Sequence, residues 1–192
     1  MNSLLKILAV ICFAGPAASY AQKAEMPEPS IFNAGDIWEW RQIDNRTTSE
    51  EGRRTRTVQK VDGNLMFSNG TNNSQISQAF IGEPASKPWR VWPLEVGKKW
   101  VYDGDWVRAD GLRGNTKQDA EVVAYEEVTV PAGKFMAFKI NYRGFYRTSR
   151  NNGRQHDTYW YAPDANADVR HVRDDGSNMY TRELTIYKRG SP

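Results

Sequence analysis

Apolar and polar residues alternate along most of the chain in short runs that end at Gly, Pro, Asn or Asp. Such runs predict β-strands joined by tight turns. Residues 36–44 place Trp38 and Trp40 on one face of a strand. Residues 53–69 predict a hairpin around Asp62-Gly63, a favoured two-residue turn. The first arm of this hairpin alternates arginine with threonine, which is typical of a solvated or edge strand.

The strand pattern is stronger in the second half of the chain. Residues 100–107 place Trp100, Tyr102 and Trp106 on one face and two aspartates on the other. Turn residues at 151–153 and 174–176 then separate further alternating runs. No segment after the N-terminus has a convincing helical period, and residues 76–80 are too short a run to count as one. The pattern predicts an all-β fold, an antiparallel meander.

The stretch Val128–Tyr142, VTVPAGKFMAFKINY, interrupts two such runs with Pro-Ala-Gly. Pro131 cannot donate a ladder hydrogen bond, so the first strand must end there. Gly133 supplies the backbone freedom for a reversal. Apolar residues then alternate strictly at 136, 138, 140 and 142. We interpret Pro-Ala-Gly as a corner of the sheet and not as a phosphate-binding loop, because it lacks the Gly-rich run and the helix that such a loop needs.

Residues 1–21 have the features of a cleaved signal peptide: one early lysine, an apolar run, and the small residues Ser19 and Ala21 before the predicted cleavage point. The residue before Cys12 is Ile11, which argues against a lipoprotein cleavage motif. No later segment has the length of apolar sequence that spans a bilayer. We expect a periplasmic or secreted protein with an N-terminal arm at 22–35 and one antiparallel β domain at 36–190.

Charge and cysteine content narrow the function further. Removing residues 1–21 takes away the only cysteine and one of 26 basic residues, while all 23 acidic residues remain, so the net charge falls to +2. A near-neutral chain does not favour nucleic-acid binding. Arg143, Arg147, Arg150 and Arg154 lie among aromatic rings, and we interpret them as cation–π and carboxylate contacts across a hairpin.

The sequence offers no catalytic or metal-binding motif. His156 and Asp157 are neighbours on a strand and should point to opposite faces, so they should not share a site. His171 precedes two aspartates, but two histidines without a mature cysteine are a poor zinc set. We expect surface or hydrogen-bonded histidines, no metal, no cofactor and no enzymatic activity.

Three segments in order carry a resemblance: WPLEVGKKWVYD at 92–103, VTVPAGKFMAFKI at 128–140 and TYWYAPDANADVRHV at 158–172. Together they resemble a group of exported bacterial β-domain proteins of uncharacterised function. The resemblance covers residues 89–188. Such domains are similar to periplasmic lipoprotein-carrier half-barrels, so the resemblance implies a curved, incompletely closed barrel whose concave side can hold an acyl chain.

Aromatic residues make up 12% of the chain and are the candidate binding residues. Rings on a β domain form either its core or the lining of a pocket. A concave face lined by rings with adjacent charges would hold a lipid, a lipoprotein or another amphipathic molecule. Alternatively, it would stack on envelope glycans. The candidate residues are Trp38, Trp40, Trp100, Tyr102, Trp106 and Trp160.

Overall fold

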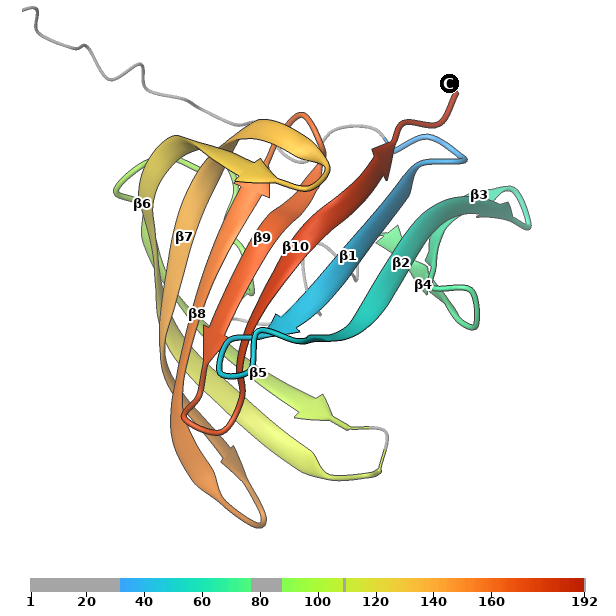
Figure 1. Cartoon of the computed structure of the whole chain (residues 1–192). Helices are drawn as coiled ribbons and strands as arrows, with labels where there is room; N and C mark the ends of the chain where they lie inside the picture. Colours follow the sequence, from blue (N-terminus) through green and yellow to red (C-terminus); the bar gives the residue numbers. More distant parts are fainter. Residues whose placement is uncertain (1–31, 77–87, 109, 192) are drawn as a thin grey trace, which may run out of the picture.

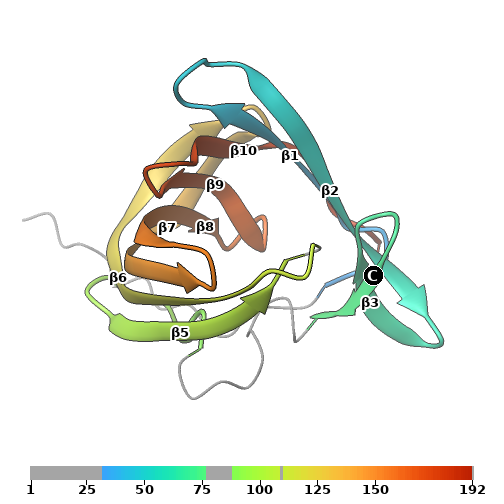
Figure 2. The same ribbon diagram turned by 90° about the horizontal axis from the view of Figure 1, so that it is seen from below.

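The computed structural model describes residues 32–76, 88–108 and 110–191. They form one ten-stranded antiparallel sheet that curls strongly and does not close (Figure 1, Figure 2). The predicted all-β antiparallel meander is therefore confirmed. The strands are β1 (Ile37–Asp44), β2 (Glu50–Val61), β3 (Asn64–Ser68), β4 (Asn73–Gln75), β5 (Lys99–Val107), β6 (Arg113–Val130), β7 (Gly133–Thr148), β8 (Asn152–Ala162), β9 (Ala167–Asp174) and β10 (Met179–Lys188).

The strand order is β4-β3-β2-β1-β10-β9-β8-β7-β6-β5, so the first and last strands pair at the centre of the sheet. This pairing joins two meanders, with Trp38 opposite Tyr187 and Trp40 opposite Leu184. Strands β4 and β5 are consecutive in the chain but lie at the two opposite edges. Of the segment between them, the described residues 88–98 contribute Trp89, Trp92 and Leu94 to the core.

The predicted turns form where the sequence places them. Asp62 and Gly63 both have positive φ, 48° and 83°, and join β2 to β3. Gly133 has φ 136° at the corner between β6 and β7. β2 pairs with β1 from Glu50 to Thr57 but with β3 only from Thr57 to Val61, so its arginine- and threonine-rich part is mostly exposed and pairs on one side only, as the sequence predicts. What the alternation does not predict is that Arg54 and Arg56, on one face of this stretch, extend toward the hollow of the curled sheet.

Two apolar clusters hold the sheet in its curl. The first lies where β1–β3 meet the β8–β9 turn and the end of the β6–β7 hairpin. Trp38 is 1% exposed there and donates from Nε1 to the backbone oxygen of Ala165, 2.7 Å away. The backbone N–H of Ala132 donates to the oxygen of Leu184. These contacts pull the ends of distant hairpins together.

The second cluster lies under the segment that precedes β5. Leu94 is fully buried, and the ring of Trp89 stacks on Tyr142 with centroids 4.3 Å apart. Tyr142 and Trp100 both donate to the backbone oxygen of Trp89. This segment therefore packs on the concave side of the sheet as part of the core.

Two predictions about the N-terminus lie outside the described residues: the signal peptide at 1–21 and most of the arm at 22–35. At the end of the arm, Phe32 is buried against Trp38 and Phe67. Across residues 32–76, 88–108 and 110–191, no helix combines the length and apolar character needed to cross a membrane.

Candidate functional site on the concave face

A buried carboxylate organises the middle of the concave face. Asp157 on β8 is 2% exposed and accepts hydrogen bonds from side chains of three strands. His171 Nε2 and Arg173 Nε each lie 2.7 Å from its Oδ1. The amides of Gln118 and Gln155 donate to its Oδ2 at 3.0 and 2.8 Å. All four partners come from β6, β8 and β9, whose register brings them to one point.

Burial and charge act in opposite directions on this network. Burial raises the pKa of Asp157, but hydrogen bonds from His171 and Arg173 and the positive charge of Arg173 outweigh it, and the pKa lies well below the ordinary value. Burial lowers the pKa of His171, although its hydrogen bond to Asp157 opposes the shift. We conclude that at neutral pH His171 is a neutral donor, and that Arg173 balances the charge of Asp157.

A second ion pair ties the connecting segment to the sheet. Arg90 is 5% exposed, and its Nη2 lies 3.0 Å from Oδ1 of Asp168 on β9. Its guanidinium group also lies 5.2 Å from the ring centroid of Tyr161. The backbone oxygen of Asp168 accepts a hydrogen bond from Trp40 Nε1 at 2.8 Å. Arg90 thus holds the side chain of Asp168, which lines the pocket described next.

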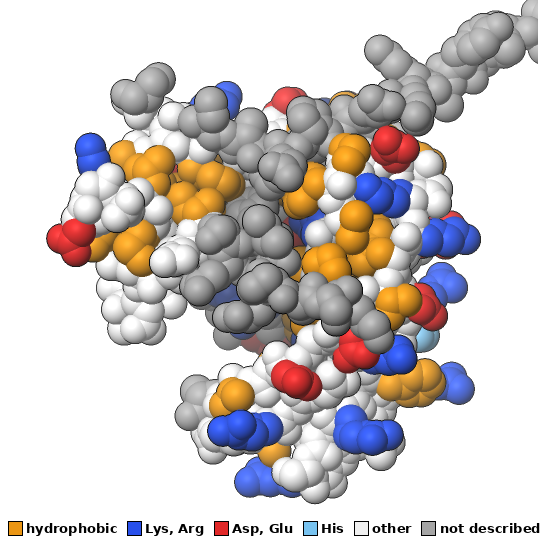
Figure 3. Space-filling view, turned by 180° about the vertical axis from the view of Figure 1, so that it is seen from behind, with side chains coloured by type: hydrophobic (Ala, Val, Ile, Leu, Met, Phe, Trp, Pro, Cys, Tyr) orange, Lys and Arg blue, Asp and Glu red, His pale blue; other side chains and the backbone are white. Residues whose placement is uncertain are grey.

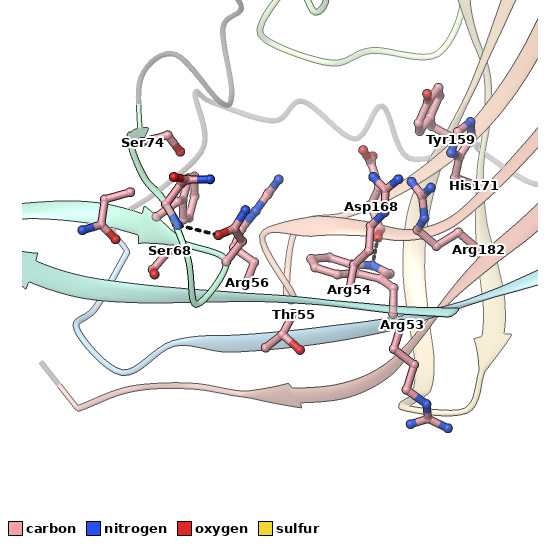
Figure 4. A pocket seen from close by; sticks show the side chains of 15 residues that line it. Arg53, Arg54, Thr55, Arg56, Ser68, Ser74, Tyr159, Asp168, His171 and Arg182 are labelled. Atoms are coloured by element: carbon pink, nitrogen blue, oxygen red, sulfur yellow. Dashed lines mark hydrogen bonds between the residues drawn. The ribbon is translucent and has the colours of Figure 1, made fainter. Parts of the chain in front are cut away.

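A first pocket lies between the β1–β3 strands and β9–β10, with a cavity volume of about 640 Å³. Aromatic rings and guanidinium groups share its wall (Figure 4). The side chains of Arg54 and Arg56 extend from β2 toward the pocket, whereas Arg53 extends to the opposite side of the strand. The other principal lining side chains are Trp40, Phe67, Tyr159, Asp168, His171 and Arg182.

The second pocket, of about 650 Å³, lies toward the hairpin ends of β5–β6 and β7–β8. Tyr102, Trp106 and Tyr146 supply its rings, and Trp106 Nε1 donates to Thr116 at 2.9 Å. Trp89 lines this pocket and contacts Tyr159 of the first pocket edge-on, with centroids 5.1 Å apart. The two pockets therefore adjoin across this pair of rings. The same hairpin ends form the lower lobe in Figure 3, which is mainly polar and charged.

The six candidate binding residues divide into three groups. Trp40 lines the first pocket, and Tyr102 and Trp106 line the second. Trp38 lies in the first core cluster, and Trp100 packs edge-on against Tyr142. Trp160 lines neither pocket.

Trp160 instead takes part in a polar cluster, where it donates to Glu126 and lies close to Lys139 and Arg170. Its side chain lies opposite Lys139 across the β7–β8 ladder.

His156 and Asp157 do not share a site, as the strand pattern predicts, because Asp157 is buried and His156 is exposed. Sequence reasoning missed the pairing of Asp157 with His171 and Arg173, which needs the β8–β9 register. It also missed Arg54 and Arg56 as pocket residues. The only available signal was that both arginines share a face with Val58, the one buried residue of β2. Among the described residues, no group of three His, Cys, Asp or Glu side chains could hold a metal ion.

Comparison with known proteins supports the fold alone. No protein-family model matches the chain, and no curated protein matches it. A crystal structure of "a putative lipoprotein" from Parabacteroides distasonis superposes with a TM-score of 0.55 at 15% identity, covering 81% of this chain and 96% of that one. A "putative exported protein with YmcC-like fold" from Bacteroides fragilis gives a TM-score of 0.52 at 14% identity, covering 82% and 97%. The chain therefore shares its fold with bacterial proteins that are described as exported or as lipoproteins.

Proposed function

We propose that this is an exported, non-enzymatic protein of the cell envelope that binds an amphipathic molecule in the first pocket. The supporting observation is a cavity of about 640 Å³ whose wall combines rings with polar and charged side chains. This volume lies within the range of small-molecule sites, roughly 300–1,000 Å³. Apolar contact with Trp40 and polar contact with groups from β2 and β10 would together suit a molecule with two unlike ends.

The proposal includes no catalytic step. The buried carboxylate of Asp157 already accepts from four side chains, so it has little capacity left to act as a base. Export is supported by the signal-peptide pattern of residues 1–21 and by the descriptions of the two similar structures.

A second candidate function rests on the second pocket. Tyr102, Trp106 and Tyr146 stand there beside the amides of Gln118 and Gln155. Flat rings next to hydrogen-bonding amides suit sugar rings, whose faces are apolar and whose edges carry hydroxyl groups. We therefore retain glycan binding as the alternative, at this pocket and not at the first.

Two blocking variants distinguish these functions. Ser74 lines the first pocket and Ser177 the second, and both are exposed, so Ser74→Phe and Ser177→Phe each add bulk to one pocket only. The ligand probes are octaethylene glycol monododecyl ether and a chito-oligosaccharide, titrated calorimetrically into the full chain. We expect the ether to bind to the unchanged protein. Ser74→Phe should abolish this binding, and Ser177→Phe should preserve it. Binding of the sugar alone, lost in Ser177→Phe, would favour the alternative. Binding of neither the ether nor an anionic amphiphile with a similar alkyl chain would overturn the proposal.

A further inference from the structure

Four arginines line the first pocket, Arg53, Arg54 and Arg56 on β2 and Arg182 on β10, and the side chains of all but Arg53 extend toward it. Strand β1 lies between β2 and β10 and brings them together. Arg54 is opposite Trp40 on β1, and Arg182 is opposite Gln42, two residues further along the same strand. Figure 4 shows Arg54, Arg56 and Arg182 extending toward the side of the sheet that carries Asp168 and His171.

These guanidinium groups lack carboxylate partners within the described part of the chain. The guanidinium groups of Arg54 and Arg56 take part in no ion pair there, and Arg182 donates to the neutral amide of Gln42 at 2.7 Å. The Nε atom of Arg182 is buried without a hydrogen-bond partner. Asp168, the acid in the pocket wall, is already paired with Arg90.

The remaining arginine of β2, Arg53, is paired, which makes the contrast informative. Arg53, next to Arg54 but on the opposite side of β2, pairs with Glu39 at 2.7 Å and Glu50 at 2.8 Å. Arg56, in contrast, is held by rings: its guanidinium lies 4.7 Å from the ring centroid of Phe67 and 5.7 Å from that of Trp40. The pocket thus contains a surplus of positive charge next to apolar surface.

This surplus has an energetic cost in the unliganded protein. Burial lowers the pKa of Arg56, and the charge of Asp168 only partly opposes the shift. Burial also lowers the pKa of Arg182, and the nearby charge of Arg54 contributes in the same direction. A partly desolvated cation without a counter-charge is unfavourable, and an anion bound between the arginines would relieve that cost.

We infer that the first pocket binds the anionic end of an amphipathic ligand, a phosphate or carboxylate group held by Arg54, Arg56 and Arg182. The planar guanidinium group presents several N–H donors in a geometry that matches both anions. The rings of Trp40 and Phe67 would lie beside the apolar part of the molecule. This inference rests on the proposed function and specifies the chemical class of its ligand.

The test compares three amphiphiles of similar chain length, two anionic and one neutral, with an anion that has no alkyl chain. Monododecyl phosphate, dodecanoate, octaethylene glycol monododecyl ether and inorganic phosphate are each titrated calorimetrically into the full chain below any micelle concentration. We expect at least one anionic amphiphile to bind about tenfold or more tightly than the neutral ether, since charge-assisted hydrogen bonds are the strong ones. Equal affinities for all three amphiphiles would overturn this inference and leave the proposed function intact.

Two other outcomes are equally decisive. If no amphiphile binds, the proposed function and this inference both fail. If inorganic phosphate binds as tightly as monododecyl phosphate, the anion site is supported, and the amphipathic ligand is overturned.

Arginine variants locate the site. Arg54 is exposed, so Arg54→Gln should fold normally, and Arg53→Gln removes the same charge from the opposite side of β2. We expect Arg54→Gln and Arg56→Gln each to weaken the anionic amphiphile about tenfold and to leave the ether unchanged. Arg53→Gln should leave both affinities unchanged, and Arg56→Lys should retain part of the anion affinity. Equal effects of Arg53→Gln and Arg54→Gln would overturn the assignment.

Discussion

The Nε2 atom of His171 lies 2.7 Å from Oδ1 of Asp157, in a pair that the concave face buries almost completely. The Tyr159 ring stacks on the imidazole with centroids 3.9 Å apart, and Tyr180 contacts it edge-on. Arg173 shares the same carboxylate. This network lies between the two pockets, because His171 lines the first and Arg173 the second.

The free energy of unfolding should fall as the pH drops below about 6.5. Burial lowers the pKa of His171 from its ordinary value of 6.5, so protonation favours the unfolded chain, in which the ring is hydrated. The contribution of neutral His171 to the free energy of unfolding is complete above pH 6.5 and is lost at lower pH. Over that range the free energy of unfolding should change by at most about 1.4 kcal/mol per pH unit. Urea unfolding at roughly pH 7.5, 6.5 and 5.5 measures this change in the free energy of unfolding.

The chain has two histidines, which supplies the control for this prediction. His171→Gln should flatten the dependence on pH, whereas the exposed His156→Gln should keep it. An unchanged slope in His171→Gln would assign the pH dependence to other groups.

Replacing the central carboxylate should be severely destabilising. Asp157→Asn removes the charge that balances Arg173 and leaves the remaining network partly unpaired, which we expect to cost about 3–5 kcal/mol. The matched control is Asp119→Asn, an exposed aspartate on β6, which should change stability by less than about 0.5 kcal/mol. Chemical denaturation of both variants at pH 7.5 measures the difference; similar values would show that the network is not important for stability.

Gly144 should not tolerate even one methyl group. A Cβ at this position would overlap the backbone oxygen of Lys117 and lie 2.7 Å from the Cα of Gln118, so the β6–β7 ladder would have to move. We expect Gly144→Ala to cost about 1–3 kcal/mol. Gly52→Ala is the control, because nothing lies within 4 Å of its added atom. The two melting temperatures should differ by several degrees, roughly 4 °C or more.

The Pro-Ala-Gly corner gives a second backbone prediction. Gly133 has φ 136°, which a β-branched residue adopts only with strain, so Gly133→Val should cost about 1–3 kcal/mol. The neighbouring Lys134→Ala removes only an exposed ion pair to Glu127, 3.1 Å long, and should cost at most about 1 kcal/mol. If thermal unfolding gives equal melting temperatures, the corner does not depend on glycine.

A single hydroxyl group helps to fix the connecting segment. Tyr142 Oη donates to the backbone oxygen of Trp89 at 2.7 Å, and Tyr142→Phe should lower the free energy of unfolding by about 1 kcal/mol. The cost stays modest because Trp100 Nε1 donates to the same oxygen at 3.1 Å. Tyr146→Phe, on the same strand and without a described hydrogen bond from its hydroxyl, should change stability by less than about 0.5 kcal/mol.

The strands and their local turns could be predicted from the sequence because both depend on residues close together in the chain. Alternation predicts which side chains share a face, and Asp62-Gly63 and Gly133 predict where the chain reverses. The same pattern correctly separates Asp157 from His156. It could not predict that β1 pairs with β10, because that pairing joins residues at the two ends of the domain.

The residues that line the pockets were predicted only in part, because sharing a face does not determine what covers it. Trp38 and Trp40 share a face, yet contact with Ala165 buries Trp38 in the core while Trp40 lines a pocket. Arg54 and Arg56 matched a solvated strand equally well. Only the curl of the sheet places them opposite Arg182 and Asp168.

The sequence by itself thus determined an antiparallel β domain, its tight turns and the two-sided character of each strand, since period-2 patterning and turn chemistry are local. The tertiary structure alone decided which side is concave, which rings are core, and which charges meet. Asp157, His171 and Arg173 come together through the register of β8 with β9, and Arg54 and Arg182 through their common neighbour β1. Register and curvature arise from packing between distant segments, which no single stretch of sequence encodes.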